Sequence, residues 1–429
     1  MLPHHTLVLI GLLLASPVVV AQSPSENTVD VLHWWVSDGE KRSIDTIRHH
    51  IENQGMNWHD EAFAGSGTNR FSDILRQRVE AGNPPMASQV IGYDIHEWAK
   101  KDKLVILDDI ASEQQWDEVI PFGIQHLSKY RDHWVAAPIN AHSTNWMWVN
   151  HAQLTRLGLT KPDTWNDLLR MLDAAKSAQI IPIAIGHEAW EHTLLFESVA
   201  AGSEGAEFYR RVFMDLTLKP SDTEAFERIF QRMSTLRSYL DSGSGMRSWN
   251  QATDLVRSGH ALLQVQGSWV NGEFSAHGLI PGQDYDCFHF PDTQGVVLFN
   301  SDQYILFKDH PATPETQSRF VSTLMSVSLQ RDLNIATGAA PARVDVPKSG
   351  FNQCGRQAIN DMRAANMRRT VMGSIAMGNA NPSAVKNALY QVISDHLMAR
   401  IDNAQAVNRL EHVIKRAMHS RETNHASVQ

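Results

Sequence analysis

Apolar positions along the chain fall into two spacings, one typical of helices and one typical of strands. Ile44, Ile47 and Ile51 recur every three to four residues and predict a helix. A second helical stripe begins at Phe71 and ends before the proline pair 84–85, because a proline ring does not continue a helix. Short apolar runs predict strands at residues 29–33, 87–91, 134–137, 146–149, 180–185, 261–265 and 296–299.

The order of these elements indicates the fold class. Strands alternate with helices over most of the chain, which predicts an α/β fold with helical crossovers. Thr164, followed by Asp167 three residues later, predicts a further helix start. From about residue 314 onward the pattern is mainly helical.

The N-terminal segment has the pattern of an export signal. Residues 7–20 form a short apolar run, and small residues lead to Ala21 with Gln22 next. The run is too short for a typical membrane span, and no later segment is continuously apolar over ~18 residues. We therefore expect residues 1–21 to be a signal peptide cleaved near Ala21, and the mature protein to be soluble and exported.

The length and the net charge of the chain limit the number of domains and the kinds of partner that are expected. Roughly 400 residues remain after such a cleavage, more than a single core usually supports, so two domains or lobes are expected. The formal net charge is −9 and no basic run is present, which argues against nucleic acid as a partner.

The chain has only two cysteines, Cys287 and Cys354. An oxidising compartment favours a disulfide between them, and the alternative is two free buried thiols. Neither cysteine has the C-x-x-C or histidine spacing of a zinc or redox site, so no metal is predicted.

Two adjacent tryptophans, Trp34 and Trp35, end the first predicted strand, and Glu40 follows five residues later. An indole packs on the C–H face of a sugar ring, and a carboxylate accepts hydrogen bonds from its hydroxyls. The segment therefore indicates carbohydrate binding. The alternative is that both tryptophans are ordinary core residues.

Three other predicted strands also end in aromatic or polar residues. These strand ends are residues 142–146, 266–269 and 300–302. In α/β sheets, ligands collect beyond the carboxyl ends of strands, so we expect the four strand ends to converge on one site.

The sequence lacks the motifs that would indicate an enzyme. His187 and His192 flank Glu188 as H-E-x-x-x-H, one residue too long for the zinc pair of a helix, and Trp190 beside them is a candidate for the cleft. We find neither a G-x-S-x-G sequence nor a phosphate loop, and predict no catalytic residues and no cofactor. A carbohydrate-active hydrolase with the same stacking residues stays as an alternative, although no carboxylate pair can be assigned.

The chain resembles the exported glucose-binding proteins of ABC importers, within the extracellular solute-binding family that includes the maltose-binding type. The resemblance lies in the segments 33–35, 81–85, 142–146, 299–302 and 340–343. It implies a two-lobed periplasmic binding protein whose lobes are joined by crossings near 138–142, 299–302 and 338–345, with sugar in the cleft. The implied first lobe comprises residues 22–139 and 300–341, and the second comprises 140–299 and 342–429.

The resemblance also implies a function and partners. A protein of this family is a monomeric periplasmic receptor that delivers its sugar to an inner-membrane ABC permease and has no enzymatic activity. The alternative that the protein reports its ligand to a membrane sensor, rather than delivering it to an importer, is not excluded by the sequence. The segments around Cys287 and Cys354 resemble those of the family's paired cysteines.

The ligand-binding residues carried over from the resemblance match only part of the family pattern. The matching residues, together with the cleft candidates, are Trp34, Trp35, Glu40, His142, Trp190, Trp269, Asn300 and Asp302. Ile91, Thr337 and Met377 stand where glucose binders carry two lysines and a histidine. Each lost donor that met a hydroxyl should cost ~1–3 kcal/mol.

Fewer donors predict a ligand other than free glucose. Another hexose, a deoxygenated or alkylated sugar, or a small glycoside fits the more apolar wall better. The loss of cations also argues against a sugar acid, although Arg343 keeps that class open. The alternative is that water, or Arg343 and Tyr93, replaces the missing donors.

Overall fold

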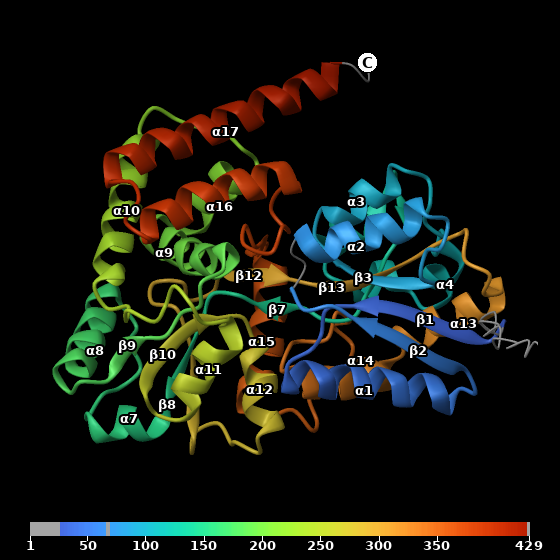
Figure 1. Ribbon diagram of the computed structural model, residues 1–429, viewed down its shortest axis with the longest axis horizontal. Helices are drawn as coiled ribbons and strands as arrows, with labels where there is room; N and C mark the ends of the chain where they lie inside the picture. The colour runs from blue at the N-terminus through green and yellow to red at the C-terminus, as the bar shows by residue number, and fades with distance from the viewer. Residues whose placement is uncertain (1–25, 66–68, 427–429) are drawn as a thin grey trace, which may run out of the picture.

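The computed structural model describes residues 26–65 and 69–426, which form two lobes side by side (Figure 1). The predicted signal peptide and its cleavage near Ala21 lie outside the described residues. Within the described part of the chain, no helix has both the length and the apolar character that crossing a membrane requires.

The first lobe is built on a five-stranded sheet in the order β2-β1-β3-β13-β6. Its strands are β1 Thr28–His33, β2 Asn57–Ala62, β3 Ala87–Ile91, β13 Asp302–Leu306 and β6 Ala137–Pro138. β1 is parallel to both β2 and β3, whereas β13 is antiparallel to β3 and β6. The sheet therefore receives one strand, β13, from a distant part of the chain.

Helices cover this sheet, and one of them, α1 (Asp38–Asn53), positions residues of the candidate site. α1 begins with a capping box in which Ser37 and Glu40 bond each other's backbone N–H, and it buries Ile44, Ile47 and Ile51 as the sequence predicts. The other helices of this lobe are α2 Asn69–Glu80, α3 Asp94–Ala99, α4 Asp108–Glu113, α5 Trp116–Val119, α6 Phe122–Ser128, α13 Pro314–Leu324 and α14 Val327–Thr337.

Residues 134–137, predicted as one strand, are instead divided between two. β5 is His133–Trp134, which pairs with β4 Lys129–Tyr130, and the strand ending in Pro138 is β6. Val135 and Ala136 are buried but lie in neither strand. The apolar run reflects burial between two short strands rather than one continuous ladder.

The second lobe contains a four-stranded sheet in the order β11-β8-β10-β9. The strands are β8 Trp146–Asn150, β9 Ile181–Ile183, β10 Ala261–Gln266 and β11 Tyr285–His289. A three-stranded sheet, β14-β12-β7, lies beside it. Its strands are β7 His142–Ser143, β12 Val297–Asn300 and β14 Val371–Gly373.

Helices surround these two sheets, and α16 and α17 pack over α9 and α10 at the top of Figure 1. α8 begins at the predicted capping box of Thr164 and Asp167. The helices are α7 His151–Arg156, α8 Trp165–Ser177, α9 Ala189–Tyr209, η1 Arg210–Met214, α10 Asp222–Arg237, α11 Trp249–Arg257, α12 Val270–Ala276, α15 Gln353–Arg368, α16 Ser383–Leu397 and α17 Asn403–Ala426. The mainly helical C-terminal part is confirmed.

Extended segments connect the two lobes. One runs from β6 to β7 and another from β12 directly into β13. A bridge between Ala141 and Ala340 brings the segment after α14 alongside the first of these. The two-lobed α/β fold is thus as the sequence indicates, and the lobe boundaries at 139, 299 and 341 stay predictions.

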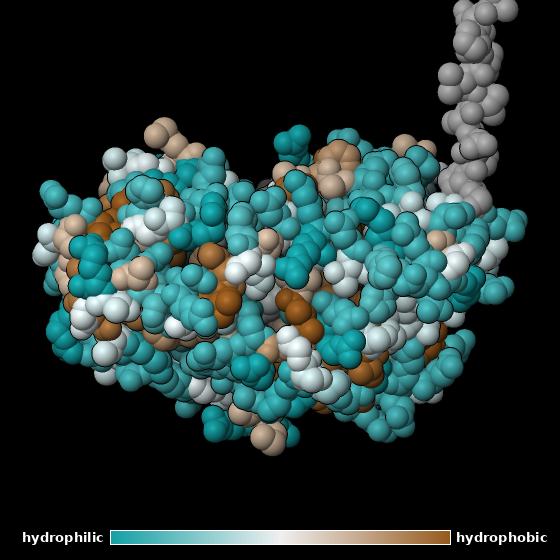
Figure 2. Space-filling view, turned by 90° about the horizontal axis from the view of Figure 1, so that it is seen from below, coloured by the Kyte–Doolittle hydropathy of each residue, from teal (hydrophilic) through white to brown (hydrophobic). Residues whose placement is uncertain are grey.

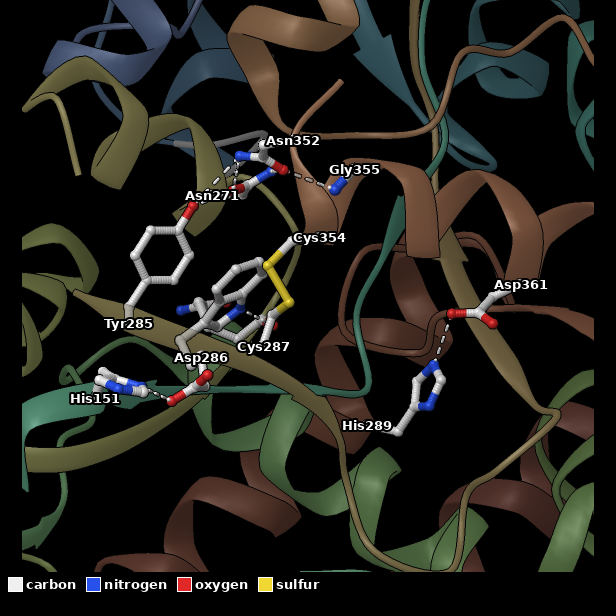
Figure 3. Close-up of a disulfide and its surroundings, with 12 residues drawn as sticks. His151, Asn271, Tyr285, Asp286, Cys287, His289, Asn352, Cys354, Gly355 and Asp361 are labelled. Atoms are coloured by element: carbon white, nitrogen blue, oxygen red, sulfur yellow. Dashed lines mark hydrogen bonds and ion pairs between the residues drawn. A yellow bond between two sulfur atoms is a disulfide. The ribbon is translucent and has the colours of Figure 1, made fainter. Parts of the chain in front are cut away.

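The predicted disulfide between Cys287 and Cys354 is present. It joins β11 to the first turn of α15, beside Tyr285, Asn271 and Asn352, whose side chains hydrogen-bond one another (Figure 3). The two cysteines are 67 residues apart in the sequence. The bridge therefore closes a long loop of the unfolded chain.

Replacing both cysteines with alanine is expected to lower the free energy of unfolding by about 2–4 kcal/mol, because the chain-entropy model gives roughly 4 kcal/mol for a loop of this length. Urea unfolding of the oxidised wild type and the double variant measures the difference. Equal midpoints with equal slopes would show that the bridge does not contribute to stability.

Candidate binding site

A small cavity lies between the two lobes. Both lobes contribute to its wall. The lining residues are Trp34, Trp35, Gly39, Glu40, Ser43, His142, Trp190, Trp249, Trp269, Asn300, Asp302, Thr337 and Met377. The convergence expected from the strand ends therefore holds, since residues from all four lie here. The face in Figure 2, by contrast, is mostly hydrophilic, with apolar side chains in small separate groups.

Five indoles line the cavity. Trp34 and Trp35 follow β1 directly, whereas Trp190, Trp249 and Trp269 stand at or just before the starts of α9, α11 and α12. The ring centroids of Trp190 and Trp269 are 6.1 Å apart at an interplanar angle of 63°. The wall therefore presents several aromatic faces, which suit a ligand with apolar ring faces.

Trp249 is a lining residue that the sequence analysis missed. Its signal was the Ser-Trp pair that opens a helix, since Ser248 caps α11 just before Trp249 in the same way that Ser268 precedes Trp269. Gly267 then allows the Trp269 indole to lie close over the backbone, because a Cβ at Gly267 would overlap the ring.

Glu40 is held in place by the helix that carries it. Its Oε2 accepts the backbone N–H groups of Val36 and Ser37, each at 2.9 Å. Burial, and to a smaller extent the nearby carboxylate of Glu273, raise the pKa of Glu40 to about 7 against the lowering effect of its hydrogen bonds. Oε2 is thus occupied by the backbone, and Oε1 is the oxygen available to a ligand.

Glu273 belongs to α12 of the second lobe and contacts the start of α1 in the first lobe. Its Oε1 accepts Ser37 Oγ–H at 2.6 Å and Gly39 N–H at 2.9 Å. A Cβ at Gly39 would come within 2.6 Å of the same oxygen. The lobes are therefore closed upon each other at this edge of the cavity. Burial raises the pKa of Glu273 as well.

Asp302 is fixed by two carboxamides. Gln89 Nε2 donates to Oδ1 at 2.9 Å, and Asn140 Nδ2 donates to Oδ2 at 2.7 Å. His142 Nε2 lies 3.4 Å from Oδ2. Asn300 Oδ1 is buried and has no hydrogen-bond partner within the described residues, so this oxygen is an acceptor that a ligand can satisfy.

The three positions that depart from the family pattern lie in different places. Thr337 and Met377 line the cavity. Ile91 pairs with Asp302 across the sheet, yet it lies in a neighbouring hollow against Trp34. At the two cavity positions, a hydroxyl and a thioether therefore stand where stronger donors were expected.

The structure does not bring Arg343 to the cavity. Its guanidinium pairs with the carboxylate of Asp345 at 2.7 and 2.9 Å and donates to Met325 O. A guanidinium satisfied in this way is not available as a donor for a cavity ligand. Tyr93, the other substitute considered, donates its backbone N–H to Gly378 O and is not among the lining residues.

The H-E-x-x-x-H segment serves the cavity indirectly. Glu188 Oε2 accepts Trp190 Nε1–H at 3.0 Å and so orients that indole. His192 bonds Ser394 and Gly186 O, and burial lowers its pKa to about 4. Across residues 26–65 and 69–426, no group of three or more histidine, cysteine, aspartate or glutamate side chains is suited to a metal ion.

Two α/β lobes with extended crossings and a closed, aromatic cavity between them define a ligand-binding protein of the periplasmic binding type. The chain belongs to the bacterial extracellular solute-binding protein family, whose model matches residues 62–319.

Relatives and solved structures agree with this assignment. A "Probable sugar-binding periplasmic protein" of Brucella suis biovar 1 is 40% identical over 94% of this chain and 96% of its own length. A protein of the same name from Rhizobium meliloti is 41% identical over 92% and 95%. A solved "Chitin oligosaccharide binding protein" superposes with a TM-score of 0.74 at 19% identity, over 92% of this chain and 100% of the other, which shows a shared fold.

Proposed function

We propose that this protein is a periplasmic carbohydrate receptor that captures a sugar between its lobes and delivers it to an inner-membrane ABC permease. The observation that carries the proposal is the cavity between the lobes, which five indoles line together with two carboxylates and an amide oxygen that has no partner among the described residues. Apolar faces with acceptors at their edges complement a sugar ring. The names of the Brucella and Rhizobium relatives support the same function.

Individual roles follow from the positions of the side chains. Trp35 and Trp269, from different lobes, pack on the sugar, with Trp34, Trp190 and Trp249 completing the wall. Glu40 Oε1 and Asn300 Oδ1 accept hydroxyl hydrogens, and Asp302 and His142 order the polar end. Ile91 supports Trp34 from behind, and Arg343 has no part in the site.

The ligand in this proposal is a monosaccharide or a small glycoside other than free glucose. Thr337 and Met377 leave the wall with few donors, and Arg343 is engaged elsewhere, so a sugar acid is disfavoured. Calorimetry against glucose and the best sugar of a panel tests this, and the proposal about glucose is wrong if glucose binds most tightly.

Location and assembly belong to the same proposal. The predicted export signal and the family support a periplasmic location, and the receptor is proposed to act as a monomer. The family consists of solute-binding proteins rather than enzymes. The hydrolase alternative predicts release of reducing ends from oligosaccharides, and we expect a reducing-sugar assay to detect none.

A thermal-shift screen of sugars and polyols tests the receptor function. A ligand at 100 times its Kd should stabilise the protein by about 2.7 kcal/mol and raise Tm by a few degrees. Small-angle scattering with the best ligand should also show contraction, because the ligand draws the lobes together. If no carbohydrate shifts Tm, the receptor proposal fails.

A further inference from the structure

Apart from His142, the ionisable side chains that line the cavity are all acidic. The lining includes two carboxylates, those of Glu40 and Asp302, and neither a lysine nor an arginine. A third carboxylate, Glu273, lies at the edge of the cavity and bonds the first turn of α1 next to Glu40. A ligand in this space meets a negative potential, which a low-dielectric surrounding strengthens.

Neither lining carboxylate has a lysine or arginine partner among the described residues. Glu40 is bonded by two backbone N–H groups, and Asp302 by the carboxamides of Gln89 and Asn140. Uncharged donors orient a carboxylate without neutralising it. The cavity therefore holds two buried carboxyl groups with no lysine or arginine beside them, and a cationic ligand would favour their ionised forms.

His142 lies beside Asp302, with its Nε2 3.4 Å from Asp302 Oδ2. The same nitrogen is 3.2 Å from Asn140 Nδ2, and Nδ1 is 2.9 Å from Ser268 Oγ. Both ring nitrogens are therefore engaged by neighbouring groups of the protein.

Nearby basic side chains are directed elsewhere. Arg42 donates to Ser275 O, and Arg343 pairs with Asp345. Lys386 is buried against Gly378, with its Nζ 5.9 Å from the Tyr390 ring centre, and it is not among the lining residues.

The indoles add a second preference for positive charge. An ammonium is attracted to the face of an aromatic ring, and tryptophan is the strongest of these partners. Carboxylates and aromatic faces together form the surroundings in which proteins bind amines. The same two groups also suit the ring and hydroxyls of a sugar.

We infer that the preferred ligand is an amino sugar, a hexose with a free, protonated amine, rather than a neutral or acidic sugar. The inference rests on the proposed function and names its substrate class.

Calorimetry of the mature protein at low ionic strength, at a pH where the amine is protonated, tests this inference. The probes are glucosamine, galactosamine and mannosamine, each compared with its neutral hexose and its N-acetyl derivative. At least one free amine should bind on the order of tenfold more tightly than both uncharged counterparts. Its affinity should fall with added salt, whereas that of the neutral sugars should not.

The variant Glu40→Gln keeps an oxygen for the N–H groups of Val36 and Ser37 but removes the charge. It should reduce the ratio of amine to neutral affinity severalfold, whereas Glu113→Gln, a charge removed from an exposed position on α4, should leave the ratio unchanged. Equal or tighter binding of the neutral or N-acetyl sugars overturns the amino-sugar inference and leaves the receptor intact. A failure of every carbohydrate to bind overturns both.

Discussion

Replacing Trp269 with alanine is expected to weaken binding of the best sugar ligand by about 2–3 kcal/mol, roughly 30- to 150-fold. The indole lies over Gly267, at centroid distances of 6.1 Å from Trp190 and 5.2 Å from His142. Its removal takes away the principal apolar face that the second lobe offers to a ring. Because Trp269 is only partly buried, the free energy of unfolding should change far less than the affinity.

Calorimetry gives the affinity, and urea unfolding gives the stability of the same variant. Trp165→Ala is the matched control, since this half-buried indole on α8 packs under Arg232 at 4.7 Å and does not line the cavity. It should leave the affinity unchanged. If Trp269→Ala instead unfolds readily while its folded fraction keeps full affinity, Trp269 is a core residue and the stacking role is wrong.

The sequence was informative where a side chain's role follows from its place at the end of a strand. Trp35 lies two residues after β1, and Asn300 and Asp302 stand at the junction of β12 and β13. All three line the cavity. β1 and β13 belong to one sheet, so Trp35 and Asp302 meet at a shared edge, whereas Asn300 ends β12 of the neighbouring sheet and reaches the cavity because β12 runs directly into β13.

Site residues that lie on helices or at contacts between the lobes were harder to predict from the sequence. Trp249 starts α11 and Glu273 lies within α12, and no periodicity indicates that either faces the other lobe. Their positions depend on how closely the lobes approach, which in turn depends on Gly39 having no Cβ. A contact between residues more than 230 positions apart leaves no local pattern in a single sequence.

Two carried-over residues show the limit of resemblance. Ile91 occupies the expected strand position, but its side chain packs against Trp34 rather than lining the cavity. Arg343 follows the expected segment, but Asp345 two residues later takes its guanidinium. In both cases a neighbouring side chain, not the backbone path, determines whether the residue reaches the site.

Replacing Glu40 with glutamine is expected to weaken sugar binding and, at neutral and alkaline pH, to stabilise the folded protein. Burial raises the pKa of Glu40 from 4.5 to about 7. Between these values the folded state holds a proton that the unfolded state has released. Stability therefore falls as pH rises from about 4.5 to 7 and stays low above it.

The neutral glutamine does not undergo this loss. At pH 8 the variant should exceed the wild type by about 1–3 kcal/mol in free energy of unfolding, and the difference should shrink toward zero below pH 4.5. Urea unfolding at pH 4.5, 6 and 8 measures it. A variant less stable than the wild type at pH 8 would show that the carboxylate's cap on Val36 and Ser37 outweighs its desolvation. The expected result means that Glu40 is retained for its ligand at a cost in stability, as a buried acceptor that binding alone satisfies.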